Sequence, residues 1–252
     1  MKDVIIKTEL MCKSYISDGE VNNVIKNMNL EIYEGDFTVI MGSSASGKST
    51  LLYSISGMDE ITTGKVFLNG HNITSLKEKQ ISMLRKEKLG FVFQGINLIP
   101  NLTVYENILS PTYKTGTDRR EIDRRIDLLL DKMELGSQRK KFPNQMSGGQ
   151  KQRAAICRAL INQPKVLFAD EPTGALNSAQ GENVLDIFSD IHREGQSIVM
   201  VTHDLKAAIR GNRILYLKDG RIDGDLRLGE YEAAGCRERE EAVYNFLKEK
   251  GW

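Results

Sequence analysis

The sequence contains few cysteines and no long apolar run, and both scarcities exclude whole classes of protein. The three cysteines, Cys12, Cys157 and Cys236, are odd in number and far apart, so neither a disulfide framework nor a CxxC metal site follows. No uninterrupted run of apolar residues exceeds four, whereas a membrane-spanning helix needs roughly 20. Met1–Leu10 carries charges throughout and lacks the apolar region of a secretory signal. We therefore expect a cytosolic protein with reduced thiols.

An excess of charge of one sign is also lacking. Lys+Arg number 35 and Asp+Glu 34 among the 252 residues, which gives a net charge of +1. Nucleic-acid-binding proteins usually carry a basic excess, so we expect no nucleic acid partner. With 27% charged and 40% hydrophobic residues and no Pro- or Ser-rich linker, the composition predicts a single domain over residues 1–252.

Short apolar runs alternate with helical patterns along the chain, which predicts an α/β fold. The runs are nearly continuous, as strands of a parallel sheet buried on both faces require. They are Phe37–Met41, Gly90–Gln94, Val166–Ala169, Ile198–Thr202 and Ile214–Lys218. The first 35 residues and Gly64–Ile73 predict shorter strands of an antiparallel flank instead, with turns at Asp18-Gly19, Glu34-Gly35 and Asn69-Gly70.

The middle of the chain, about residues 97–161, has a helical pattern. Thr103-x-x-Glu106 and Asp118-x-x-Glu121 are capping-box patterns that predict helix starts. This stretch therefore predicts a helical subdomain inserted between two sheet-forming halves. A further amphipathic helix is expected near the C-terminus, about Arg237–Lys250.

The first chemical motif matches the phosphate-loop pattern GxxxxGK[ST] and follows the predicted strand Phe37–Met41. Its residues are Gly42, Ser43, Ser44, Ala45, Ser46, Gly47, Lys48, Ser49 and Thr50. Successive N–H groups of such a loop cradle phosphate oxygens at a helix N-terminus. Lys48 is expected to reach the β- and γ-phosphates and the Ser49 hydroxyl to ligate Mg²⁺. The fold expected is therefore a P-loop NTPase core with a mostly parallel sheet.

Two adjacent carboxylates, Asp170 and Glu171, follow the apolar strand Val166–Ala169. In an open α/β sheet, ligands lie beyond the carboxyl ends of the strands, where these acids emerge. Asp170 fits a Mg²⁺ ligand, and Glu171 fits the group that orients and polarises an attacking water.

A second glycine-rich stretch, Ser147, Gly148, Gly149 and Gln150, precedes the helical pattern Lys151–Ile161. It reads as a second anion-binding nest at a helix N-terminus. The chain has only one phosphate loop and one acidic strand end. A second anion-binding nest therefore suggests that these residues bind phosphate at the site of another copy of the chain.

These motifs, with Gln94 and Thr202-His203-Asp204, occur in the order found in ATP-binding cassette (ABC) ATPases, which the chain resembles over about Ile5–Ile222. The resemblance implies ATP hydrolysis with Mg²⁺ as cofactor. It implies that Gln94 contacts Mg²⁺ and senses a membrane partner, and that His203 contacts the γ-phosphate. Tyr15 looks like the aromatic on which adenine stacks.

The same resemblance implies partners. Ser147–Gln150 would contact ATP bound to a second copy of the chain, in a head-to-tail dimer holding two nucleotides. An integral membrane permease would hold the dimer at the inner face of the cell membrane. Since stacking on Tyr15 without base-edge hydrogen bonds distinguishes purines poorly, we expect GTP to be accepted to some degree.

Two positions depart from the family pattern. Ala45 stands where glycine is frequent, and a positive φ there would cost on the order of 1 kcal/mol. Asn177 stands where aspartate is usual in a turn that crosses the dimer interface, although an asparagine keeps a hydrogen-bond acceptor.

Other residues indicate the subgroup. Phe91–Asn107 resembles the ATPases of lipoprotein release, macrolide export and antimicrobial-peptide resistance. Asp170–Ser178 and the ending Gly251-Trp252 are similar to the bacitracin-resistance type, which implies a long permease and an associated sensor kinase. The alternatives are the macrolide-export, lipoprotein-release and cell-division types, the last a scaffold that hardly hydrolyses ATP. A cassette ATPase acting on DNA or ribosomes is disfavoured by the single cassette and the even charge.

Overall fold

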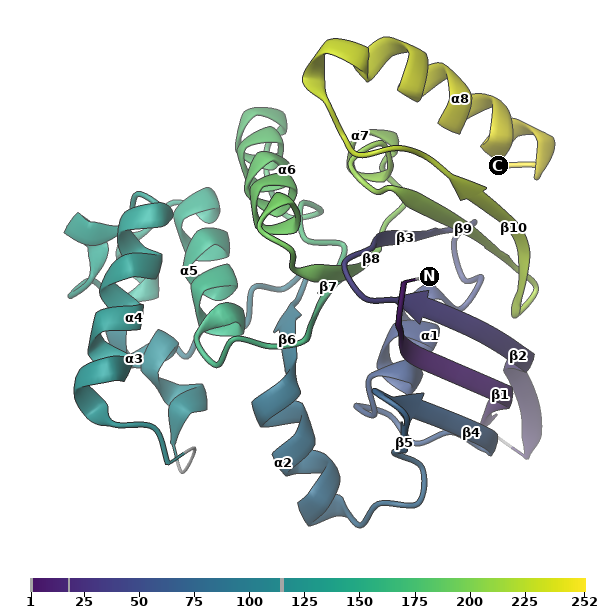
Figure 1. Ribbon diagram of the computed structural model, residues 1–252, viewed down its shortest axis with the longest axis horizontal. Coiled ribbons are helices and arrows are strands. Elements are labelled where there is room, and N and C mark those ends of the chain that lie inside the picture. Colours follow the sequence, from purple (N-terminus) through teal and green to yellow (C-terminus); the bar gives the residue numbers. More distant parts are fainter. Residues whose placement is uncertain (1, 18, 114–115) are drawn as a thin grey trace. The chain divides into compact units, whose positions relative to one another are not determined.

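The computed structural model describes residues 2–17, 19–113 and 116–252, and its elements form two compact units. The first unit comprises Met1–Ile81 with His192–Trp252, and the second comprises Ser82–Ile191. Figure 1 labels the elements of both units. Some of the motifs lie in the first unit and the others in the second. The expectation of a single domain over residues 1–252 stays a prediction.

The first unit contains an antiparallel sheet in the order β2-β1-β4-β5 (Figure 1). Its strands are β1 (Val4–Ser17), β2 (Glu20–Tyr33), β4 (Thr63–Leu68) and β5 (His71–Asn72). This sheet is the antiparallel flank that the sequence predicts. Of the expected turns, Gly35 and Gly70 adopt the positive φ that favours glycine, whereas Asp18 lies outside the described residues.

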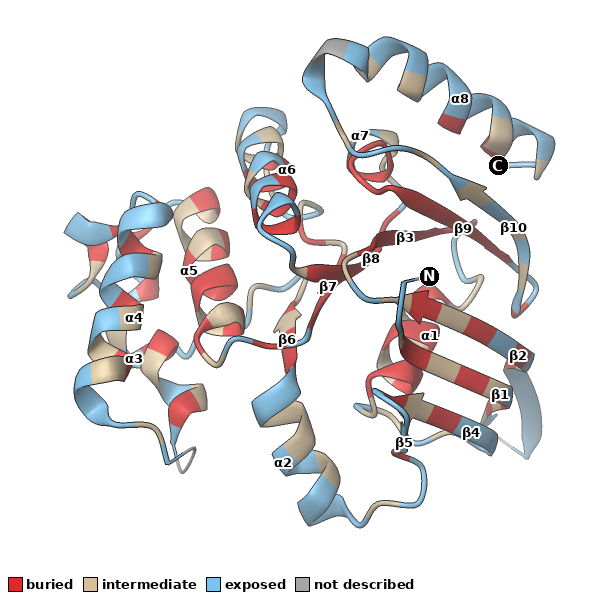
Figure 2. Cartoon of the chain, in the orientation of Figure 1, coloured by how far each residue is buried: buried red, intermediate tan, exposed pale blue. Residues whose placement is uncertain are grey.

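A second sheet region of the first unit has the order β10-β9-β3-β8. Strand β3 (Phe37–Met41) pairs in parallel with β8 (Ser197–Val201) and β9 (Arg213–Lys218), and β10 (Arg221–Arg227) is antiparallel to β9. Every residue of β3 and β8 is buried (Figure 2). Continuous burial explains why these strands read as unbroken apolar runs.

Helices cover the sheets of the first unit. Helix α1 (Lys48–Ile55) contacts β1 and β2 on one side and β8 on the other, so it fills the space between the two sheets. Short helix α7 (Leu205–Ala208) contacts helix α8 (Cys236–Glu249), which follows the one-turn helix η4 (Ala233–Gly235). Val243 and Leu247 are the buried residues of α8, as its amphipathic pattern predicts.

The second unit is mainly helical around two parallel strands, β6 (Leu89–Val92) and β7 (Val166–Asp170). Helix α5 contacts α3, α4 and β6 and so forms the centre of the unit. The longer helices are α2 (Glu78–Lys88), α3 (Val104–Leu109), α4 (Arg119–Lys132), α5 (Gly148–Leu160) and α6 (Ser178–Arg193). The one-turn helices are η1 (Ser110–Thr112), η2 (Gly136–Gln138) and η3 (Pro143–Gln145).

Both predicted helix starts in this unit are present, but only one forms a reciprocal capping box. Thr103 and Glu106 exchange hydrogen bonds at the start of α3. Asp118 caps α4 by accepting from the Arg120 N–H, whereas Glu121 binds Arg124 and Arg125. The carboxylate of Glu121 therefore joins an ion-pair cluster on the helix.

Candidate functional site

The phosphate loop lies in the first unit, between the end of β3 and the start of α1. Packing requires both of its glycines. A Cβ on Gly42 would lie 2.3 Å from the carbonyl oxygen of Leu217, and one on Gly47 would lie 2.8 Å from Val24 Cγ1. Gly47 also has φ 96°, a conformation that L side chains rarely adopt. The loop is therefore pressed between β9 and the antiparallel flank.

Ala45 adopts a φ of 63°, so the non-glycine residue of the loop is left-handed. Because this φ is positive, the backbone conformation of Ala45 costs on the order of 1 kcal/mol. Such strain at a loop that approaches a ligand is typical of functional sites.

Lys48 is turned back onto its own loop. Its Nζ donates hydrogen bonds of 2.9 Å to the carbonyl oxygens of both Gly42 and Ser43, and the residue is 9% exposed. The buried hydroxyl of Ser46 has no hydrogen-bond partner. A buried ammonium and an unsatisfied hydroxyl in a loop of backbone N–H groups suit a polyphosphate that accepts hydrogen bonds.

His203 lies at the same sheet edge as this loop. Ile40 of β3 pairs in parallel with Val201 of β8, so the residues that follow both strands emerge together. His203 is exposed, and its neighbour Asp204 caps α7 by accepting from the Lys206 N–H. The first unit thus brings the phosphate loop and His203 to one edge.

Tyr15, near the end of β1, is connected to the phosphate-loop helix. Its hydroxyl donates a 2.7 Å hydrogen bond to Asp59 and also shares a side-chain hydrogen bond with Thr50. Burial and then the hydrogen bond to Asp59 raise the pKa of Tyr15. The residue is 42% exposed, so part of its surface is available to a ligand.

The second unit holds the acidic pair and Gln94. Asp170 is the buried last residue of β7, and Glu171, directly after it, has φ 43°. Val92 of β6 pairs in parallel with Ala169, so Gln94 emerges at the same edge as the acids. A Cβ on Gly174 would lie 2.8 Å from Gln94 Nε2, so the loop after Glu171 returns to Gln94.

The second glycine-rich stretch is also in the second unit, and it lies inside helix α5. The sequence predicts a helix start at Lys151, but the helix begins three residues earlier, at Gly148. The earlier start follows from the capping box that Ser147 and Gln150 form. Gly149 is buried against the side chain of Gln180 on α6. Asn177 accepts a 2.9 Å hydrogen bond from the Gln180 N–H, so it uses its acceptor to hold the start of α6.

Sequence reasoning missed two supporting residues. Arg158 of α5 donates hydrogen bonds to the carbonyl oxygens of Ile96 and Asn97, two left-handed residues in the loop after Gln94. Lys13 lies over the ring of Tyr15 and pairs with Asp59. A lysine two residues before an aromatic on a strand is a signal that could have indicated Lys13, because both side chains project from one side. Nothing in the local sequence indicates the contact of Arg158.

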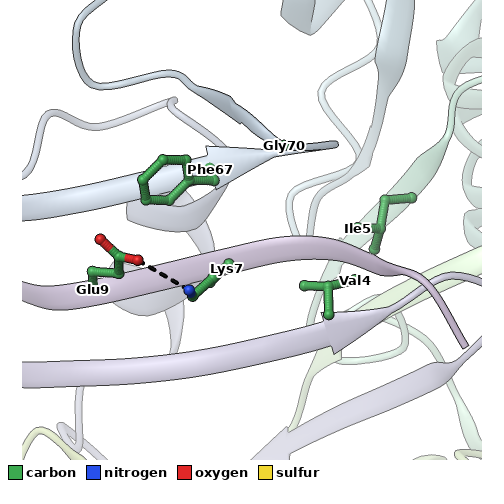
Figure 3. A pocket seen from close by; sticks show the side chains of 6 residues that line it. All are labelled: Val4, Ile5, Lys7, Glu9, Phe67 and Gly70. Atoms are coloured by element: carbon green, nitrogen blue, oxygen red, sulfur yellow. Dashed lines mark ion pairs between the residues drawn. The ribbon is translucent and has the colours of Figure 1, made fainter. Parts of the chain in front are cut away.

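Other features of the described residues lie away from these groups. A pocket of about 250 Å³ on the antiparallel flank is lined by residues that include Val4, Phe67 and the ion pair Lys7–Glu9 (Figure 3). None of the predicted site residues lines it. Within the described ranges, no three His, Cys, Asp or Glu residues gather as a metal cluster, and no helix has the length and apolar character needed to span a bilayer.

Comparison with known proteins agrees with this geometry. A family model described as "ABC transporter" matches residues 25–174. The lipoprotein-releasing system ATP-binding protein LolD of Aquifex aeolicus is 47% identical, over 81% of this chain and 91% of the relative. The macrolide export ATP-binding/permease protein MacB of Aggregatibacter actinomycetemcomitans is 43% identical over 87% of this chain, which spans only 34% of that relative.

Among solved structures, the dimeric post-hydrolysis state of the ATP-binding cassette MJ0796, bound to ADP and Pi, has a TM-score of 0.82 and 39% identity. The match covers 90% of this chain and 100% of the other. The fold and the phosphate loop thus define a nucleotide-hydrolysing cassette of the P-loop class. The chain belongs to the ABC transporter family, as an ATPase subunit that uses ATP and Mg²⁺.

Proposed function

We propose that the residues at the two sheet edges divide the work of ATP hydrolysis among binding, positioning and proton transfer. Lys48 and the N–H groups of Gly42–Thr50 bind the β- and γ-phosphates, and Tyr15 stacks on adenine. The observation that carries this proposal is the position of Lys48, nine-tenths buried with its ammonium inside the loop. A phosphate that replaces the two carbonyls as acceptor forms a charge-assisted hydrogen bond, which is stronger than one to a neutral carbonyl.

Oxygen ligands present in the chain suit Mg²⁺, which usually takes one or two protein oxygens together with water and substrate phosphates. The Ser49 hydroxyl, the Asp170 carboxylate and the Gln94 amide oxygen would hold it. When bound, the ion neutralises charge on the phosphates.

Glu171 orients the attacking water by accepting a hydrogen bond from it, and its carboxylate takes the proton as the water oxygen bonds to the γ-phosphorus. The bond from this phosphorus to the bridging oxygen breaks, and ADP leaves with that oxygen. His203 donates a hydrogen bond to a γ-phosphate oxygen. Asp170 is buried, whereas Glu171 has a left-handed φ of 43° and is partly exposed, and this difference supports separate roles for the two acids.

The second copy of the chain supplies Ser147, Gly148, Gly149 and Gln150 to the bound ATP in a head-to-tail dimer. The dimeric state of the solved relative, MJ0796, supports this assembly. The dimer drives an integral membrane permease at the inner face of the cell membrane, and Gln94 relays the state of the γ-phosphate to it. The names of LolD and MacB, which belong to export and release systems, support a permease partner.

We propose that the transporter confers resistance to peptide antibiotics of the bacitracin or lantibiotic kind, with a sensor kinase as associated partner. The resemblance of Asp170–Ser178 and Gly251-Trp252 to that type supports this finer role. The second candidate is macrolide export or lipoprotein release, which the names of the relatives favour. An inhibitory-concentration series on wild-type and deletion strains separates the two. A fall in resistance to peptides alone supports the first, and raised macrolide sensitivity or a lipoprotein-sorting defect supports the second.

The variant Glu171→Gln tests the division of labour. It should keep ATP binding but slow hydrolysis roughly 10²–10⁴-fold, because general-base assistance is lost while the shape is kept. With turnover blocked, gel filtration in Mg-ATP should show a dimer. Glu240→Gln, an exposed substitution on α8, is the control and should hydrolyse ATP at the wild-type rate. Turnover by Glu171→Gln at that same rate would remove Glu171 from its role.

A further inference from the structure

The ring of Tyr15 is held both on one face and at its hydroxyl. The Lys13 ammonium lies 4.6 Å from the ring centroid, and the hydroxyl donates to Asp59 Oδ2 at 2.7 Å. A side-chain hydrogen bond also joins the hydroxyl to Thr50, in the first turn of α1. The orientation of the ring relative to the phosphate-loop helix is therefore fixed within the protein itself.

Lys13 directs its ammonium entirely into this cluster. Its Nζ donates to Asp59 Oδ1 at 2.7 Å and to the carbonyl oxygen of Glu60 at 2.6 Å, and its side chain is only 9% exposed. Burial opposes ionisation of Asp59, but the hydrogen bonds from Lys13 and Tyr15 outweigh it and lower the pKa of Asp59. One charged carboxylate thus holds both the ammonium and the phenol.

The two faces of the Tyr15 ring differ. Lys13 and Tyr15 are two residues apart on a strand, so their side chains project from the same side of the sheet. Strand β1 stays regular between them, because the extra residue between the pairs Lys13–Ile25 and Ser14–Asn23 is Val24 of β2. Lys13 lies over one face of the ring, and Tyr15 remains 42% exposed, so ring surface that Lys13 does not cover is accessible to a ligand.

We propose that Lys13 and Asp59 are positioning residues for the nucleotide base, which hold the Tyr15 ring with one face covered and the other open for a purine to stack. The inference rests on the proposed adenine-stacking role of Tyr15. The ammonium behind the ring also draws electron density from the open face. Because neither residue touches the base, both act through Tyr15, and their effect is the same for ATP and GTP.

The test compares ATP with a ligand that has phosphates but no base, using the full chain. The variant Lys13→Met should raise the KM for ATP about 3- to 10-fold with kcat unchanged. The inhibition constant of Mg-tripolyphosphate should stay at its wild-type value, since there is no base to stack. Lys13→Arg keeps a cation for the ring and should restore most of the KM. Lys7→Met changes a lysine on the same strand whose side chain is 45% exposed; it is the matched control and should leave KM unchanged.

A double-mutant cycle locates the effect. In a Tyr15→Ala background, Lys13→Met should add no further increase in KM, because the ring through which it acts is absent. An unchanged KM in Lys13→Met alone overturns the inference. So does a tripolyphosphate inhibition constant that rises as much as the KM, since Lys13 would then act on the phosphate loop.

If Lys13→Met does not fold, Tyr15→Phe decides, because it keeps the ring and the cation and loses the bond to Asp59. A rise in KM for ATP without a change for tripolyphosphate supports the inference, and an unchanged KM overturns it. An unchanged KM in Tyr15→Ala would refute the stacking role itself, and this inference with it. The phosphate-binding role of Lys48 would stand, since the melting shift of Lys48→Ala with Mg-ATP measures that role separately.

Discussion

Replacing Lys48 by alanine removes the ammonium that hydrogen-bonds the carbonyl oxygens of Gly42 and Ser43. Hydrogen bonds from a charged group stabilise a protein by about 1.5–3 kcal/mol. In a protein of this size, 1 kcal/mol changes the melting temperature by about 2–4 °C. The variant without nucleotide should therefore melt about 3–12 °C below wild type.

The effect on ligand binding is more specific, because it concerns the nucleotide alone. At a concentration 100 times Kd, Mg-ATP stabilises the wild-type protein by about 2.7 kcal/mol, a rise in melting temperature of about 5–11 °C. Loss of a charged contact worth about 1.5–3 kcal/mol weakens binding roughly 10- to 100-fold. At the same ATP concentration the stabilisation then falls to about 0.4–1.4 kcal/mol.

Thermal melting followed with a dye, with and without Mg-ATP, measures both quantities. Lys7→Ala is the matched control, because Lys7 is a partly exposed lysine of the same unit that pairs with Glu9. It should melt like wild type and keep the full shift with Mg-ATP. Equal shifts in wild type and Lys48→Ala would refute the assignment of the phosphate loop.

Two further predictions concern packing and acid stability. Gly42→Ala should destabilise the protein by about 1–3 kcal/mol, because its Cβ would lie 2.3 Å from the Leu217 carbonyl oxygen. Denaturant unfolding measures this loss. The control Gly229→Ala should show no such loss, because a Cβ there meets nothing within 4 Å. Hydrogen bonds from Arg124 and then Arg125 lower the pKa of Glu121 from 4.5 to about 2. A lowered folded-state pKa contributes stability that is present above pH 4.5 and lost as the pH falls toward 2. In an acid titration followed by circular dichroism, Glu121→Gln should therefore lose less stability across that window than wild type does.

The sequence by itself determined the buried apolar strands, the starts of α3 and α4, and the motifs. Strands buried on both faces show as unbroken apolar runs, as in β3 and β8, and capping depends on residues three apart, as in Thr103 and Glu106. The phosphate loop was recognisable because its chemistry requires particular residues at fixed spacing. At Ala45 the pattern indicated only that a positive φ would be strained, and the structure supplied the φ of 63°.

Only the tertiary structure decided the contacts made between residues distant in the chain. Gly42 must be glycine because of Leu217, and the start of α6 depends on the acceptor of Asn177. The orientation of Tyr15 depends on Asp59, 44 residues away, and the loop at Asn97 is held by Arg158, 61 residues away. Spacing cannot encode such partners, because folding brings together side chains whose separation along the chain follows no period.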